Sequence, residues 1–149
     1  MLHKARIHEY CIELLNDKIT GIHQLIADAR AASNDDTKSS MGDKYETTRE
    51  MMQIEIDKLQ YQLADAQNQL LGLKVLDASR KCEKAEPGAL VSTDKGVFYI
   101  AVGLGKVVVG NESVMVISPA SPIGKIMLGN TAGSSFTLNQ STYNISEIG

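Results

Sequence analysis

Residues 33–46 read SNDDTKSSMGDKYE, a short polar stretch that carries four carboxylates and two lysines. On both sides of it lie long stretches whose apolar residues recur with helical spacing. A polar break between two such stretches predicts a turn, because its side chains favour solvent over a packed helix face. We therefore expect residues 33–46 to form the tip of a helical hairpin and to be the part of the chain that meets a target.

Both flanking stretches follow the alternating three- and four-residue spacing of a heptad, which predicts two helices that each bury one stripe of side chains. We expect the first helix over residues 2–32 and the second over residues 43–80. Ser40 and Asp43 have the spacing of a capping box at the start of the second helix. The predicted seam residues are Ala5, His8, Ile12, Leu15, Ile19, Ile22, Ile26 and Ala29 in the first helix, and Tyr45, Arg49, Met52, Ile56, Leu59, Leu63, Ala66, Leu70 and Leu73 in the second.

The two seams match in reverse order about a centre near Ser39, which favours an antiparallel hairpin over the alternative, a coiled coil between two chains. In this register Ile22 faces Ile56 and Leu15 faces Leu63. About thirty helical residues at about 1.5 Å each would give an arm of about 45 Å.

The cysteines and histidines give no sign of a disulfide or a metal site. The hairpin pairing separates Cys11 from Cys82, so we expect two reduced thiols. His8 lies on the predicted seam, and no Cys or carboxylate completes a metal-ligand set around it.

After Pro87 and Gly88, which end the helical pattern, the sequence changes to short apolar runs separated by turn signals. Ser121 and Pro122 have the types typical of the N-cap and first residue of a helix, so one short helix is expected there. The expected strands are residues 89–93, 97–102, 106–109, 112–118, 136–138 and 142–148.

These elements predict an α+β fold, with an antiparallel coiled-coil hairpin followed by a small antiparallel β domain that contains one short helix. The expected divisions are an arm at residues 1–82, a linker at residues 83–88 and the β domain at residues 89–149.

Charge is concentrated in the helical part of the chain. Residues 1–86 carry 12 of the 15 Lys and Arg and 15 of the 18 Asp and Glu, and the net charge is -3. This balance gives no basic field for direct nucleic-acid binding. No apolar run approaches the roughly 20 residues of a membrane span, so we expect a cytoplasmic protein. The GLGK stretch at residues 103–106 lacks the Ser or Thr that follows the lysine of a phosphate-binding loop, and it predicts a β-turn.

Residues 116–124 read VISPASPIG and are followed by Leu128-Gly129, Gly133 and the closing YNISEI at residues 143–148. This order resembles the S-P-I-G…L-G…G…Y-x-I…I pattern of the bacterial Gre transcript-cleavage factors, which bind RNA polymerase. Residues 45–50, YETTRE, are similar to the family's E-Y-x-x-A-[RK]-E at the start of the second helix. Together with the layout, the resemblance covers nearly the whole chain.

The resemblance implies an FKBP-like β domain that docks at the rim of the polymerase secondary channel, while the coiled coil enters the channel. Acidic tip residues of the family help to hold a catalytic Mg²⁺ in the polymerase active site, where backtracked RNA is cleaved. The chain would then need no cofactor of its own, would meet nascent RNA only within the polymerase complex, and would work as a monomer away from membranes.

The tip of this chain departs from the family pattern, because the family's two key acids fall on Lys38 and Met41. Neither side chain can bind a metal ion as a carboxylate does. The candidates to assist the polymerase Mg²⁺ are Asp43, Asp35 and Asp36, with tip support from Tyr45, Glu46 and Lys38. The candidate docking residues on the β domain are Ser121, Pro122, Ile123 and Gly124.

Three alternatives remain open from the sequence. The tip could occupy the polymerase channel and regulate transcription without stimulating cleavage. An FKBP-like domain could instead act as a chaperone or prolyl isomerase, which would need an aromatic-lined pocket. This half of the chain has no Trp and offers only Phe98, Tyr99, Phe136 and Tyr143, a thin lining for such a pocket. Finally, the chain could be a coiled-coil adaptor with no polymerase partner. No Ser-His-Asp or Cys-His arrangement can be assembled, so we do not expect an enzyme with its own active site.

Overall fold

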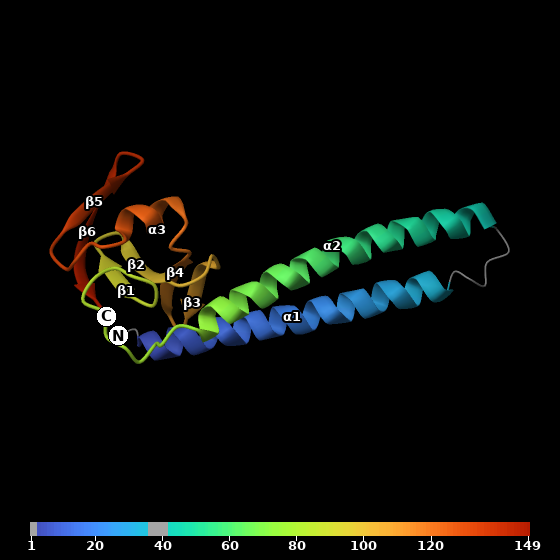
Figure 1. The fold of residues 1–149 in the computed structure, drawn as a ribbon, viewed down its shortest axis with the longest axis horizontal. Helices are drawn as coiled ribbons and strands as arrows, with labels where there is room; N and C mark the ends of the chain where they lie inside the picture. The colour runs from blue at the N-terminus through green and yellow to red at the C-terminus, as the bar shows by residue number, and fades with distance from the viewer. Residues whose placement is uncertain (1–2, 36–41) are drawn as a thin grey trace. The chain divides into compact units, whose positions relative to one another are not determined.

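The computed structural model describes residues 3–35 and 42–149, and its architecture is α+β (Figure 1). Two long helices, α1 (Lys4–Asp35) and α2 (Gly42–Lys74), precede all the strands. The chain divides into two compact units. The helical unit is Leu14–Leu70, and the β unit combines Met1–Glu13 with Leu71–Gly149.

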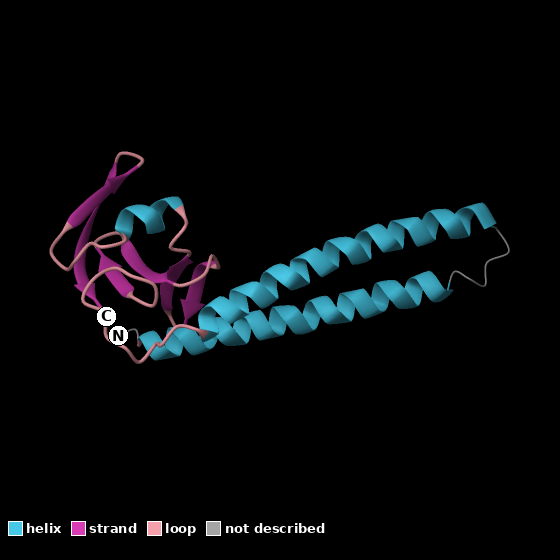
Figure 2. Ribbon diagram, in the orientation of Figure 1, coloured by secondary structure: helices cyan, strands magenta, loops and turns pink. Residues whose placement is uncertain are grey.

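The helical unit contains most of α1 and α2, the two long helices drawn in cyan in Figure 2. Most of the predicted seam is at least partly buried there, whereas Arg49 is exposed. Burial of one stripe on each helix supports pairing through these stripes, although the exact register stays a prediction. The buried seam residues of this unit are Leu15, Ile22, Ile26, Ala29, Ile56, Leu59 and Ala66.

The start of α1 differs from the predicted seam. Ala5 is exposed, while Ile7 and Cys11 are fully buried. Residues up to Glu13 group with the β strands. The start of α1 therefore buries Ile7 and Cys11, which the heptad did not predict, beside His8, which it did.

The second helix ends earlier than predicted, at Lys74 instead of Arg80. The Leu76 N–H donates to the Leu73 carbonyl, only three residues earlier, which tightens the last turn of the helix. The Ser79 N–H donates to Asp77 Oδ1 at 3.0 Å. A carboxylate that binds a backbone N–H two residues later offers the chain a turn in place of a further helical turn. Leu73 is also the last buried residue of the seam, and the next two seam positions, Asp77 and Arg80, are exposed.

The six strands form one sheet with the order β3-β4-β2-β1-β6-β5. The prediction of an antiparallel sheet was wrong at one place, because β2 and β4 are parallel and the sheet is mixed. The β3–β4 hairpin turns back so that β4, and not β3, lies beside β2. The strands are β1 (Leu90–Thr93), β2 (Gly96–Ile100), β3 (Gly105–Val109), β4 (Glu112–Ile117), β5 (Ser135–Leu138) and β6 (Ser141–Ile148).

Both faces of the central strand β2 are buried. Phe98 and Ile100 belong to a core cluster with residues of β1, β6 and the short helix α3 (Pro122–Met127). Tyr99 points to the other face, in register with Val116 of β4, and both are fully buried. Cys82 and Ala85 also join the core cluster, so residues from the end of the predicted arm and from the predicted linker help to stabilise the β unit.

No helix in the described part of the chain is long and apolar enough to cross a membrane.

Candidate functional site

The predicted tip residues lie at or beyond the ends of the two long helices. Asp35 is the last residue of α1, and Asp43 and Tyr45 lie in the first turn of α2. Glu46 is exposed on α2. Asp36 and Lys38 lie outside the described residues, as do Ser40 and Met41, so the capping box stays a prediction.

The predicted docking residues form the start of α3. Ser121 is its N-cap, and the Ser121 Oγ accepts the Gly124 N–H at 3.1 Å and donates to the Ser118 carbonyl at 2.6 Å. This cap and Pro122 at the first helical turn confirm the predicted short helix. Only Pro122 of the four docking residues is exposed, since Gly124 is buried and Ile123 packs against the core cluster. Ser121 and Gly124 therefore set the backbone conformation beneath this surface.

Replacing Ser121 with Ala should lower the free energy of unfolding of the β unit by about 1 kcal/mol, because the cap oxygen at the helix start is lost. Urea unfolding followed by near-ultraviolet circular dichroism measures the change. The control is Ser113→Ala, on an exposed position of β4, which should change stability by less than about 0.5 kcal/mol. Equal effects of the two substitutions would contradict a capping role for Ser121.

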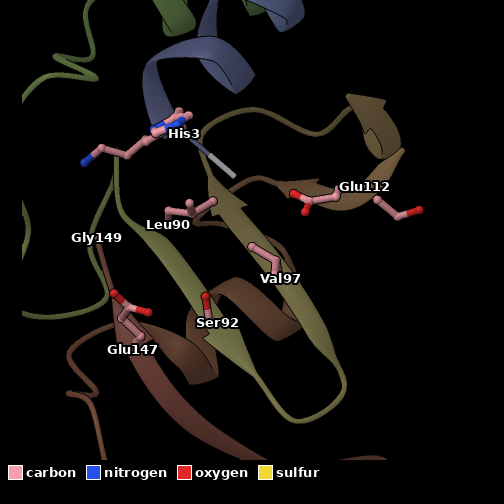
Figure 3. A pocket seen from close by; sticks show the side chains of 9 residues that line it. His3, Leu90, Ser92, Val97, Glu112, Glu147 and Gly149 are labelled. Atoms are coloured by element: carbon pink, nitrogen blue, oxygen red, sulfur yellow. The ribbon is translucent and has the colours of Figure 1, made fainter. Parts of the chain in front are cut away.

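An open pocket of about 520 Å³ lies on the β unit, at the end of the sheet nearest the start of α1 (Figure 3). Leu90, Ser92 and Val97 line it from β1 and β2, and Glu112 and Glu147 add carboxylates from β4 and β6. The remaining lining residues are His3, Lys4, Ser113 and Gly149. The Lys4 ammonium already donates to the Arg80 carbonyl.

The sequence reasoning missed this pocket. Its residues come from four strands and a helix, and the pairing of Ser92 with both Val97 and Glu147 is what assembles them. Within the described residues, no three His, Cys, Asp or Glu side chains come together as a possible metal site. The pocket is thus a mixed polar and apolar hollow without a resident metal-ligand set.

A second feature that the sequence did not predict is a buried hydrogen bond between His8 and Tyr99. The His8 Nδ1 lies 2.8 Å from the Tyr99 Oη, and the two rings meet edge to face. Burial lowers the pKa of His8, against a smaller opposing effect of Glu9, so His8 is neutral at pH 7. Burial also raises the pKa of the Tyr99 hydroxyl, with further increases from Cys11 and Cys82.

The two thiols are free and buried. Burial raises the pKa of Cys11 to about 11 and raises that of Cys82 as well. Because the thiolate is the nucleophilic form, thiols held in the neutral state are unreactive. The two thiols are therefore structural, as are His8 and Tyr99. The hydrogen bond between His8 and Tyr99 joins the first turns of α1 to β2.

Three aromatic residues of the strands, Phe98, Phe136 and Tyr143, pack against one another. Phe136 and Tyr143 are stacked with centroids 4.9 Å apart, and Phe98 meets Tyr143 edge to face. None of these rings lines the pocket of Figure 3. These three rings therefore contribute to the packing of the β unit.

No family model matches this sequence, and no curated protein matches it either. Function is therefore inferred from the residues and their arrangement.

Proposed function

We propose that this chain is a Gre-like factor that binds bacterial RNA polymerase and inserts its helical hairpin into the secondary channel. The observation that carries the proposal is the pairing of two features in one chain. Two long helices meet at an acidic stretch, and a small β unit follows with an S-P-I-G helix start. This is the layout that the sequence resemblance implies.

The two helices are long enough to form an extended arm. The 32 residues of α1 at about 1.5 Å each give a helix of about 48 Å. The acids of the tip, Asp35, Asp36, Asp43 and Glu46, lie in or beside the break between α1 and α2. A carboxylate delivered there could add a ligand to a polymerase-bound Mg²⁺ and stabilise the charge that develops during phosphate attack.

Two versions of this function differ in what the tip does. In the first, Asp43 and one of Asp35 or Asp36 assist Mg²⁺ and stimulate cleavage of backtracked RNA. In the second, the tip occupies the channel and regulates the polymerase without cleavage. The presence of Lys38 and Met41 at the positions of the family's key acids favours the second version.

The test is RNA release from a defined backtracked elongation complex of bacterial polymerase in Mg²⁺, with and without the chain. If the tip assists Mg²⁺, Asp43→Ala or the double variant Asp35→Ala/Asp36→Ala should slow cleavage by about a hundredfold or more, which corresponds to about 2.7 kcal/mol of lost transition-state stabilisation. Polymerase binding, measured by fluorescence anisotropy, should be retained. Asp17→Ala, on an exposed position of α1, is the matched control and should cleave like the unchanged chain.

Each outcome assigns one version. Accelerated cleavage that a tip variant abolishes makes the chain a cleavage factor, whereas binding without acceleration makes it a channel-binding regulator. Absence of polymerase binding at micromolar concentration would refute the proposal and leave the adaptor alternative.

A further inference from the structure

A line of exposed apolar side chains runs along α2 on the face opposite its buried seam. Met51, Ile54 and Tyr61 are 63 %, 68 % and 80 % exposed. With about 100° between successive residues, these three lie roughly half a turn away from buried Ile56 and Leu59. The hairpin seam therefore leaves them uncovered.

The spacing of this face is that of a second heptad stripe. Lys58 lies between Ile54 and Tyr61, and Asp65 follows Tyr61. With these two residues the stripe advances in alternating steps of three and four residues. Tyr61 borders a hollow of about 480 Å³ that is also lined by Asp57, Gln60 and Ala64. A large aromatic beside a hollow is a typical anchor in protein interfaces.

Acidic residues border the stripe on both sides. Glu50 and Asp57 lie along one edge and Glu55 along the other, all exposed. Lys58 is the one basic residue within the stripe from 50 to 65. An apolar stripe with acidic edges fits a partner whose apolar stripe has basic edges.

A second copy of this chain does not satisfy these charges. Antiparallel pairing about residue 56 would place Met51 against Tyr61 of the other copy. In that orientation each edge position meets the same edge position of the other helix, so the two Glu55 side chains would come together and the two Asp57 side chains would come together. Parallel pairing would place Glu50 against Glu55 of the other copy. Like charges across such edges are destabilising in both orientations.

We propose that the outer α2 surface, formed by Met51, Ile54 and Tyr61 with Glu50 and Glu55 at its edges, binds an amphipathic helix of a partner protein that carries Lys or Arg on both sides of its apolar face. The apolar side chains supply the buried area, and the acidic edges select the partner and its register. This proposal does not depend on polymerase binding.

The test uses the full chain and two synthetic three-heptad peptides with Leu at the a and d positions. One peptide carries Lys at the e and g positions and the other carries Glu there. Isothermal titration calorimetry should show binding of the basic peptide at least about tenfold tighter than binding of the acidic one. Tyr61→Ala should weaken binding of the basic peptide by about tenfold or more. Val75→Ala, at an 81 % exposed position outside the surface, should leave it unchanged.

A charge swap separates recognition from loss of structure. The double variant Glu50→Lys/Glu55→Lys should lose its preference for the basic peptide and bind the acidic peptide more tightly than the unchanged chain does. Equal affinity for both peptides, or binding that Tyr61→Ala does not weaken, would overturn the proposal. A Tyr61-dependent dimer of the free chain in light scattering would also overturn it, since a second copy would then cover the surface.

Discussion

Gly124→Ala should destabilise the β unit by about 3 kcal/mol, well beyond the effect of removing the Ser121 cap. A Cβ at position 124 would lie 2.2 Å from the Ser118 carbonyl oxygen and 3.1 Å from Pro119 Cα, both backbone atoms. The Ser118 carbonyl cannot move freely, because it accepts both the Ser121 N–H and the Ser121 hydroxyl. Relief of the clash must therefore disrupt the turn that starts α3.

Urea unfolding followed by near-ultraviolet circular dichroism measures this effect, and Gly103→Ala is its control. A Cβ at Gly103 would meet no atom within 4 Å, so that substitution should change stability by less than about 1 kcal/mol. If Gly124→Ala unfolds at the same urea concentration as the unchanged chain, the Ser118 carbonyl does not lie as close to Gly124 as described. If the proposed function is correct, the variant should also bind polymerase more weakly, since the docking residues sit on this turn.

The elements that depend on local sequence were predicted well. All six strands have observed bounds within two residues of the predicted ones, because turn residues and alternation mark them. The start of α3 follows from Ser121 and Pro122, whose side chains act within one helical turn. By contrast, the end of α2 depends on a competing turn at Asp77, which periodicity alone does not reveal.

The features that the sequence did not predict depend on contacts between distant residues. The parallel pairing of β2 with β4 is one of them, although the unbroken apolar run from Phe98 to Ile100 is typical of a strand buried on both faces. The hydrogen bond of His8 is another, since the heptad pattern assigns that residue to the helical seam. The proposed tip chemistry would need a metal from another protein, so this chain's sequence can name its candidate acids but cannot complete the site.

Tyr99→Phe should lower the free energy of unfolding of the β unit by about 1–3 kcal/mol. The ring of Tyr99 is fully buried and its packing is kept by Phe, so the substitution removes only the hydroxyl. The His8 Nδ1, 2.8 Å from that hydroxyl, would then be left without its partner in a buried position. Thermal unfolding measures the change, and Tyr143→Phe, at a half-buried ring, is the matched control with an expected effect below about 0.5 kcal/mol. Equal effects of the two substitutions would show that the buried hydrogen bond contributes little.

The buried pair of His8 and Tyr99 should make the free energy of unfolding depend on pH in the weakly acid range. Burial lowers the pKa of His8 in the folded state, so the unfolded chain, with an ordinary histidine pKa of about 6.5, binds the proton more readily. The contribution of neutral His8 is therefore complete above about pH 6.5 and is lost as the pH falls towards and through the lowered pKa. His8→Asn places an amide near the position of Nδ1 and does not titrate, so the stability difference between the unchanged chain and this variant should shrink from pH 7 to pH 5. Urea unfolding at both pH values measures that difference. A difference that stays constant would mean that His8 has the same pKa in the folded and unfolded chain, and that its hydrogen bond to Tyr99 accommodates the imidazolium as readily as the neutral ring.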